Sequence, residues 1–292
     1  MAASLNLAAP TALEYFAALV ADDASLSVLE AAIVVAQDEE PHLDLHGVVS
    51  QIDALADRIR RRLPPDAAPL QRLRLLNTYF FHELGFAGNF NDYNDRRNSY
   101  LHEVLKTRRG IPITLAILYV EMARQMGLQA HGISFPGHFL VKVSLSLGEV
   151  IVDPFTGQCL SRDDLEERLA PLRWSQARQP GGEVPLGLYL QAAPARDIIA
   201  RLLRNLKEIH RRTSDRQRLA AVLQRLVTLL PWAWEERRDC ALAQADLGHL
   251  ATAVEDLTLY LKYRPDARDA PRMHQQLAAW QARDGWTPGR LQ

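Results

Sequence analysis

Hydrophobic residues recur at helical spacing over much of the chain. Near the N-terminus, for example, Leu13, Phe16 and Val20 share one face of an amphipathic helix. Such patterns predict helical structure at residues 11–63, 69–84, 99–106 and 112–126. Between the second and third of these regions lies a polar stretch rich in Asn, Asp and Gly, which we expect to be a loop.

The pattern then changes from helical spacing to alternation. Apolar residues alternate with polar or small ones over residues 132–144 and 149–153, and a short turn around Gly148 separates the two stretches. This arrangement is typical of an antiparallel hairpin. From Ala195 onward the helical spacing returns. The sequence therefore predicts an α+β fold that is mostly helical and contains a small antiparallel sheet.

The C-terminal part carries a weak internal repeat. Pro231 and Pro265 are separated by about 34 residues, the spacing of tetratricopeptide repeats. The second unit also has the small and large residues of that repeat, namely Ala241, Gly248, Ala253, Leu257 and Tyr260. The first unit matches less well. We expect two domains, residues 1–185 and a helical, repeat-like domain at residues 186–292.

Composition narrows the class of protein. Among 292 residues, 34 are Lys or Arg and 35 are Asp or Glu, so the balanced charge favours neither nucleic acid nor an anionic membrane as a partner. The start of the chain does not resemble a secretory signal, and the most apolar stretch ends too soon to span a bilayer. We predict a cytoplasmic protein.

The most informative positions lie within residues 98–157. A turn at Arg109–Pro112 precedes a predicted helix, His138 lies on a strand, and Asp153 ends the next strand. Thiol proteases have a nucleophile at a helix start, a histidine on one strand and an acid on the next. The helix end lowers the pKa of the thiol, the histidine accepts its proton, and the acid orients the histidine ring. The order of these residues therefore points to that type of site.

Three segments of this region resemble the SirB1 family of bacterial proteins. They are NSYLHEVLKTRRGIPITLA at residues 98–116, FPGHFLV at residues 135–141 and VDPFTG at residues 152–157. Members of that family are similar to transglutaminase-like domains and carry a tetratricopeptide-type tail. The resemblance extends more loosely over most of the chain, and it implies a papain- or transglutaminase-like core.

The resemblance also implies a catalytic triad without its nucleophile. In active transglutaminase-like enzymes the catalytic cysteine opens a helix that ends about fifteen residues later at a glycine. Counting back from Gly127 gives Pro112, and Ala116 falls where a small residue is expected. His138 and Asp153 fall at the other two triad positions. Proline is itself a good first residue of a helix, so its presence needs only a structural reason.

Other nucleophiles are poor substitutes for the missing cysteine. Thr114 is rotated by roughly 200° from Pro112 around the helix. Ser134 is separated from His138 by a Pro-Gly pair that disturbs the strand. Cys159 lies on a loop after Asp153 and is the best of these weak candidates.

Plainer explanations stay open for the candidate residues. A histidine on a half-buried strand often bonds to a neighbouring backbone, and an Asp-Pro pair often starts a turn. With the family resemblance, we expect His138 and Asp153 to be adjacent. Asn98 and Arg109 are expected to line the cleft in front of Pro112.

No metal or cofactor is predicted. His42, Asp44 and His46 alternate like metal ligands, but they stand at a helix start, where Asp44 is a plausible cap. The Asn- and Asp-rich residues 91–95 lack the glycine and glutamate of a calcium loop. Nucleotide-binding and serine-hydrolase motifs do not occur in the sequence.

Three functions are compatible with these features. The favoured one is a non-catalytic, pseudoenzyme-like protein that binds a peptide or protein partner through the cleft and the helical tail. The alternative is an atypical hydrolase or acyl transferase that uses the His138–Asp153 pair with Cys159 or water. A third is a scaffold in which the tail alone recognises the partner. The sequence leaves the partner and the oligomeric state open.

Overall fold

The computed structural model describes residues 10–146, 148–176 and 184–283, and these form two compact units. One unit is Asp22–Leu202, and the other joins Met1–Ala21 to Leu203–Gln292. The backbone N–H of Ala193 donates to the carbonyl of Gly132 at 2.8 Å. This bond ties the chain after residue 185 to the sheet.

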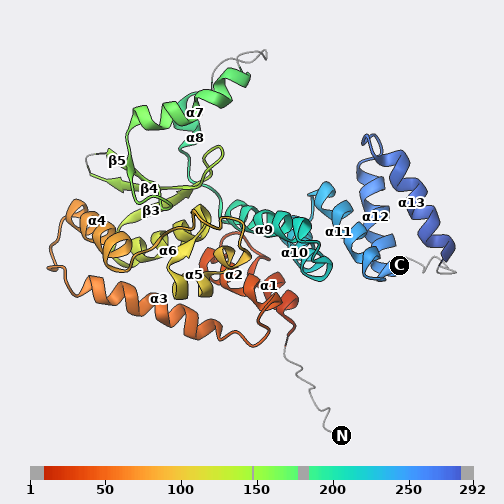
Figure 1. The fold of residues 1–292 in the computed structure, drawn as a ribbon, viewed down its shortest axis with the longest axis horizontal. Helices are drawn as coiled ribbons and strands as arrows, with labels where there is room; N and C mark the ends of the chain where they lie inside the picture. Colours follow the sequence, from red (N-terminus) through yellow and green to blue (C-terminus); the bar gives the residue numbers. More distant parts are fainter. Residues whose placement is uncertain (1–9, 147, 177–183, 284–292) are drawn as a thin grey trace, which may run out of the picture. The chain divides into compact units, whose positions relative to one another are not determined.

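The Asp22–Leu202 unit is mostly helical (Figure 1). Its helices are α2 (Val28–Val34), α3 (Leu45–Arg60), α4 (Pro69–Asn77), α5 (Leu101–Thr107), α6 (Pro112–Gln125), α7 (Arg162–Gln176), α8 (Leu186–Tyr189) and the start of α9 (Ala195–Arg212). Three short helical turns lie at Val35–Asp38, Thr78–Glu83 and Arg96–Ser99. Helix α6 lies between α3 and the sheet, and α2, α4 and α5 also contact it. This packing explains why the most apolar stretch of the sequence belongs to a core helix.

A four-stranded antiparallel sheet covers α6. Its strands are β3 (Gln129–Ile133), β4 (Leu140–Leu145), β5 (Gly148–Val152) and β6 (Cys159–Leu160), in the order β3-β4-β5-β6. A second, parallel pair joins β1 (Ala87–Gly88) to β2 (Arg109–Gly110). The expected α+β fold is thus confirmed.

The stretch at residues 132–144, expected as one strand, is divided between β3 and β4 by a turn. Pro136 in this turn has no N–H to donate to a neighbouring strand, and Gly137 has a φ of 70°. The chain therefore reverses direction here and pairs with itself, with Ile133 opposite Leu140.

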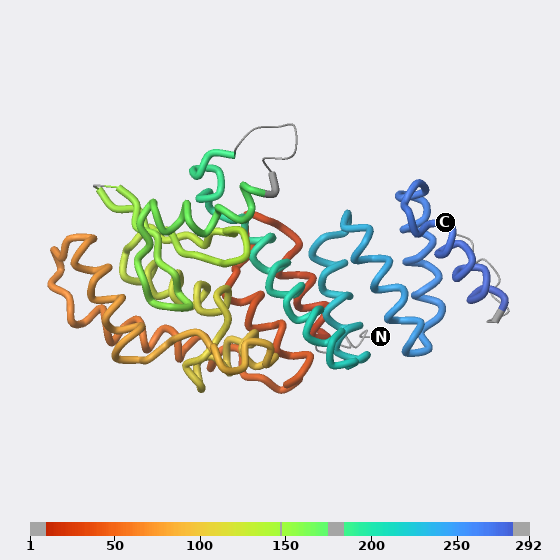
Figure 2. Tube along the Cα trace, turned by 45° about the horizontal axis from the view of Figure 1, so that its top comes forward, coloured from red at the N-terminus to blue at the C-terminus, as the bar shows by residue number. Residues whose placement is uncertain are grey.

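The second unit consists of helices, and all of them except α1 follow one another along the chain (Figure 2). They are α1 (Ala12–Leu19), the rest of α9, α10 (Arg216–Leu229), α11 (Trp234–Asp246), α12 (Leu250–Tyr263) and α13 (Ala270–Arg283). The small residues Ala241 and Ala253 are fully buried, which lets α11 and α12 pack closely. Gly248, with a φ of 86°, lies in the turn between them. The residues of the sequence repeat thus form a helical hairpin of tetratricopeptide type.

Helix α1 belongs to this second unit although it opens the chain. The guanidinium of Arg225 on α10 lies 5.0 Å from the ring of Phe16, and it also donates a hydrogen bond to the carbonyl of Ala12.

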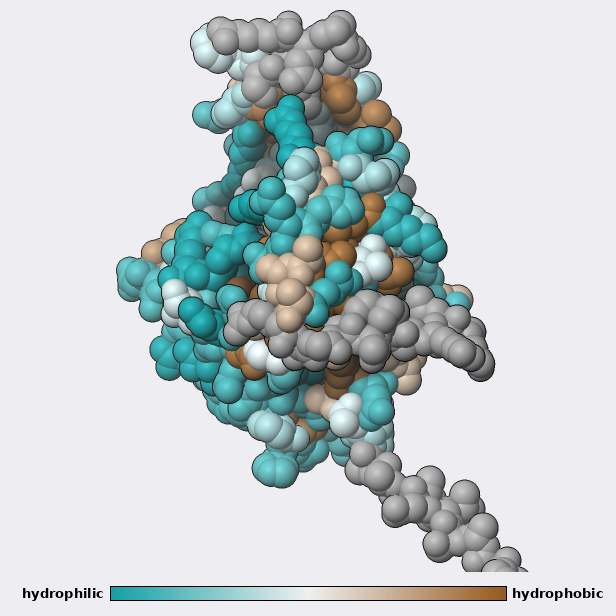
Figure 3. All heavy atoms as spheres, turned by 90° about the vertical axis from the view of Figure 1, so that its right-hand side faces the viewer, coloured by the Kyte–Doolittle hydropathy of each residue, from teal (hydrophilic) through white to brown (hydrophobic). Residues whose placement is uncertain are grey.

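On the face drawn in Figure 3, hydrophilic residues prevail and smaller apolar areas lie between them. Within the described residues, no helix is long and apolar enough to cross a membrane.

Candidate functional site

His138 stands at the end of the turn between β3 and β4. Its backbone N–H donates to the carbonyl of Phe135 at 3.1 Å, which closes the turn. Gly137, just before it, adopts a positive φ that other residues rarely accept. The His138 side chain is partly exposed, with 21% of its surface accessible. The turn therefore presents the imidazole ring at the entrance of β4 with one side open to solvent.

Asp153 follows β5 directly, and its side chain faces His138. Strands β4 and β5 are antiparallel, with Val141 opposite Val152, so the residues before β4 meet those after β5. The Nε2 atom of His138 lies 2.8 Å from Oδ1 of Asp153. The structure thus brings the two candidate residues into direct contact. The side chain of Asp153 is only 1% exposed.

Three groups stabilise the buried charge of Asp153. Besides His138, the backbone N–H of Phe155 donates to Oδ1 at 2.9 Å and Nη2 of Arg168 donates to Oδ2 at 3.1 Å. Burial alone would raise the pKa of Asp153, but the hydrogen bond and charge of His138, the Phe155 amide and Arg168 outweigh it. Together they lower the pKa of Asp153 to about 2. The group is therefore a carboxylate at neutral pH.

The charge of Asp153 fixes the tautomer of His138. An ionised carboxylate only accepts hydrogen bonds, so the Nε2 atom of His138 carries the hydrogen. In the neutral ring the other nitrogen, Nδ1, is then an acceptor. This arrangement is that of an oriented base or of a hydrogen-bond acceptor for a ligand.

Pro112 is the first residue of α6 and is buried. The nearby hydroxyl of Thr114 is also fully buried, and it donates to the carbonyl of Asn98 at 2.8 Å. It accepts the N–H of Ile111 at 3.2 Å as well. Thr114 therefore stabilises the start of α6, and its hydroxyl has no access to a substrate.

Asn98 and Arg109 organise the loop in front of α6. The amide nitrogen of Asn98 donates to the carbonyls of Asp92 and Tyr93 at 2.7 and 3.2 Å. Nη1 of Arg109 donates to the carbonyl of Gly85 at 2.7 Å. These bonds give both side chains a structural role.

Cys159 lies on β6, opposite Val152 of β5. Its sulfur lies 3.7 Å from the amide nitrogen of Asn77, and the residue is exposed. Burial raises the pKa of Cys159, and the hydrogen bond from Asn77 only partly offsets this. Across the described residues, no hydrogen bond joins Cys159 to His138. The surroundings of this thiol do not favour the thiolate.

An aromatic group beside His138 was not anticipated. The Phe155 ring lies 6.1 Å from the His138 ring, and Phe90 and Tyr93 contact Phe155 at centroid distances of 4.5 and 5.9 Å. Phe90 is 67% exposed and Tyr93 is 45% exposed. The sequence signal was the presence of aromatic residues, Phe90 and Tyr93 among them, in a loop that is rich in polar residues.

Gly88 allows this loop to approach Phe155. A Cβ atom at Gly88 would lie 2.3 Å from the Phe155 ring, so any larger residue would push the two apart. The N–H of Gly88 also donates to the carbonyl of Phe155 at 2.8 Å. Phe90 and Tyr93 are thus placed next to the His138–Asp153 pair by backbone contact.

Two groups of potential metal ligands have structural explanations. Asp44 accepts the N–H of Gly47 at 2.9 Å and caps α3, as the sequence suggested. Glu40, His102 and Glu103 bring ligand atoms within 4.8 Å of one another. Lys106 already pairs with Glu103 at 2.7 Å, and Nε2 of His102 lies 3.2 Å from Glu40, so these side chains already have partners within the protein.

Comparison with known proteins agrees with this architecture. The profile of the transglutaminase-like superfamily matches residues 46–204, and a tetratricopeptide repeat profile matches residues 206–278. The chain therefore belongs to the transglutaminase-like superfamily, in a group whose members are called UPF0162 proteins. No solved structure matches the chain.

Several relatives share this arrangement over most of their length. A UPF0162 protein of Xylella fastidiosa is 36% identical over 253 residues, which cover 85% of this chain and 88% of the relative. The UPF0162 protein of Vibrio cholerae is 26% identical over 87% of this chain and 93% of the relative. A shorter stretch of 72 residues is 42% identical to F-box only protein 21 of Homo sapiens, covering 25% of this chain and 12% of that protein.

Proposed function

We propose that this chain is a SirB1-type, non-catalytic member of its superfamily that binds a peptide or protein segment next to His138. The observation that carries the proposal is Pro112 at the start of α6, where active relatives need a cysteine. A missing nucleophile costs a triad enzyme several orders of magnitude in rate. The cytoplasm is the compartment in which we expect this function.

The surroundings of His138 support peptide binding. Phe90 and Tyr93 expose aromatic surface, which supplies much of the binding energy in many protein interfaces. Because Asp153 holds the ring through Nε2, the Nδ1 atom of His138 is left for a ligand: it accepts a peptide N–H in the neutral ring and donates to a peptide carbonyl in the protonated ring. The tetratricopeptide-type tail adds a second surface of a kind that commonly contacts proteins.

The proposal is tested by measuring binding to a peptide library and then comparing variants on the peptides retained. Phe90→Ala should weaken binding by about tenfold, since exposed aromatic anchors contribute more than 1 kcal/mol when truncated. Leu70→Ala, which removes a partly exposed apolar side chain from α4, is the matched control and should leave binding unchanged. Equal losses in both variants, or none in either, would contradict this function.

The intact His138–Asp153 pair favours an alternative, a hydrolase or acyl transferase of unusual mechanism. In it, His138 would take a proton from water or from the Cys159 thiol, and Asp153 would hold the resulting imidazolium. Turnover of a peptide or ester substrate that is lost in His138→Ala would support this alternative. An unchanged turnover in Cys159→Ala would then leave water as the nucleophile.

A further inference from the structure

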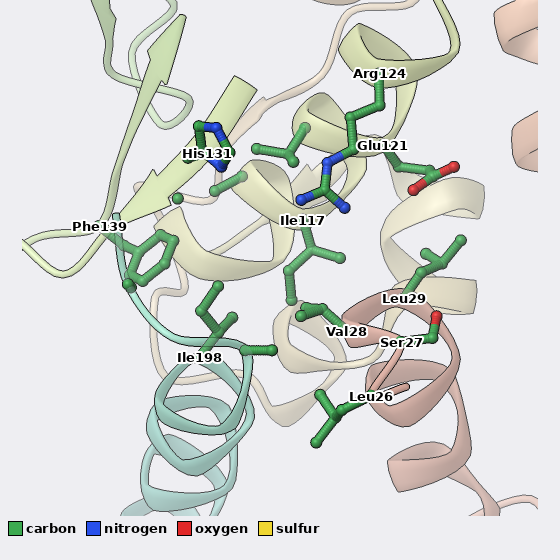
Figure 4. A pocket seen from close by; sticks show the side chains of 15 residues that line it. Leu26, Ser27, Val28, Leu29, Ile117, Glu121, Arg124, His131, Phe139 and Ile198 are labelled. Carbon is green, nitrogen blue, oxygen red and sulfur yellow. The ribbon is translucent and has the colours of Figure 1, made fainter. Parts of the chain in front are cut away.

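A second site lies in a pocket within the Asp22–Leu202 unit (Figure 4). The residues before α2 and its first turn, one face of α6, strand β3, and the chain from residue 193 to residue 198 surround it. Its floor is formed by Ile117, Phe139 and Ile198, which are 6%, 2% and 8% exposed. The pocket has a volume of about 170 Å³. It is thus a hollow with an apolar floor and a lining that also includes polar side chains.

The volume of the pocket limits the size of an occupant. A cavity of about 150 Å³ lined by Leu, Ile and Phe side chains takes up a benzene molecule. A pocket of about 170 Å³ therefore accommodates one ring or a short branched chain, but not a long acyl chain. Gly132 contributes to the shape, because a Cβ there would lie 2.7 Å from the Phe139 ring.

Besides Ser27, the polar side chains that line the pocket are those of Arg124, Glu121 and His131 (Figure 4). The guanidinium of Arg124 reaches over Ile117 between the other two. Glu121 accepts a hydrogen bond from the amide of Gln125 at 2.9 Å, whereas Arg124 makes no ion pair within the described residues. An exposed cation thus stands above an apolar floor, and no hydrogen bond from its guanidinium is found among the described residues.

His131 adds a neutral polar group to the same pocket. Burial lowers the pKa of His131, and the nearby charges of Arg124 and Lys142 lower it further. The ring is therefore uncharged at neutral pH. Lys142 itself pairs with Glu149 at 3.1 Å, so Arg124 is the cation that faces an occupant.

We propose that this pocket binds a small organic monocarboxylate whose apolar part is a single ring or a short branched chain. The carboxylate would lie on Arg124, whose planar fork matches a carboxylate with two parallel hydrogen bonds. The apolar part would lie on Ile117, Phe139 and Ile198. This site uses none of the residues of the His138–Asp153 pair and does not depend on the peptide-binding function.

The test is calorimetric titration of the full chain with 3-phenylpropionate and with its uncharged analogue, 3-phenylpropionamide. The acid should bind at least about tenfold more tightly, since hydrogen bonds between two charged groups are stronger than those to a neutral amide. Arg124→Gln should reduce the affinity for the acid to that for the amide. Arg74→Gln, an exposed arginine on α4, should change neither affinity.

A second variant tests the apolar floor without touching the charge. Val120→Phe, at a half-buried position of the pocket wall, should fill the hollow and abolish binding of both ligands while the circular dichroism spectrum stays that of the parent. The proposal is overturned if acid and amide bind equally, if Arg124→Gln binds like the parent, or if neither ligand binds at millimolar concentration. Tighter binding of decanoate than of 3-phenylpropionate would also overturn it.

Discussion

The Nε2 atom of His138 lies 2.8 Å from Oδ1 of Asp153, and this carboxylate is almost fully buried. A buried charge is tolerated only when other groups pair with it. Here Arg168 and the Phe155 amide, together with His138, are the hydrogen-bond partners of the Asp153 carboxylate. The pair is therefore a rigid structural unit as well as a candidate binding or catalytic element, and its two roles can be separated by experiment.

The first prediction concerns stability. Asp153→Ala should lower the free energy of unfolding by about 2–4 kcal/mol, because it removes three hydrogen bonds and leaves Arg168 without its partner. Urea denaturation measures this change. The control is Asp163→Ala, an exposed carboxylate on α7, which should stay within about 0.5 kcal/mol of the parent. Equal effects of the two substitutions would show that the Asp153 network contributes little.

The second prediction concerns pH. The pKa of Asp153 is lowered to about 2 in the folded state, from an ordinary value of 3.8. A lowered pKa gives stability that is present above the unfolded value and is lost as the pH falls through the folded value. This group should therefore contribute about 2 kcal/mol above pH 4, lost between about pH 4 and pH 2.

Comparison with Asp153→Asn isolates this contribution, because other carboxylates of the chain also titrate in acid. Unfolding free energies measured from pH 7 to pH 2.5 should fall less steeply in the variant than in the parent protein. Parallel curves for the two proteins would mean that the pKa of Asp153 is not lowered on folding.

Part of this site was predictable from the sequence. His138 and Asp153 flank two alternating segments, and antiparallel neighbours bring the start of one strand to the end of the next. The contact of Arg168 with Asp153 was not predictable, since it depends on how α7 packs on the sheet. Phe90 and Tyr93 were missed because their position depends on the backbone contact between Gly88 and Phe155.

In the fold, too, features set by the local sequence were predictable, whereas features set by contacts between distant segments were not. Amphipathic spacing predicts the helices, because each buries its own apolar face. The attachment of residue 193 to the sheet was not visible in the spacing, since it depends on the hydrogen bond from Ala193 to Gly132. Nor does the local sequence of α1 show that it packs on α10.

The third prediction concerns the reactivity of Cys159. Burial raises the pKa of its thiol, so the thiolate fraction at neutral pH is lower than that of an ordinary cysteine. Iodoacetamide should therefore alkylate Cys159 more slowly than it alkylates glutathione at pH 7.5. Peptide-level mass spectrometry distinguishes Cys159 from the buried Cys240. If Cys159 is instead alkylated faster than glutathione, its thiol is activated, and this favours the alternative function as a hydrolase or acyl transferase.

The fourth prediction tests whether residue 112 holds the position of a nucleophile. Pro112→Cys places a thiol at the N-terminus of α6, where unpaired N–H groups and the helix dipole lower a thiol pKa. If the cysteine also faces His138, the ring should stabilise its thiolate. We expect alkylation at pH 6.5 to be at least about tenfold faster than that of Cys159. Adding His138→Ala should remove part of this gain.

Two further variants distinguish the effect of the helix N-terminus on thiol reactivity from the effect of His138. Thr114→Cys places a thiol in the same helical turn but directed at the carbonyl of Asn98, so its reactivity should be the same whether or not His138 is present. Pro112→Ala should unfold at nearly the same urea concentration as Pro112→Cys, which controls for the loss of proline. A Pro112→Cys thiol that reacts equally fast with and without His138 would show that residue 112 does not face the histidine. The triad interpretation of the site would then fail, and His138 and Asp153 would be a structural pair only.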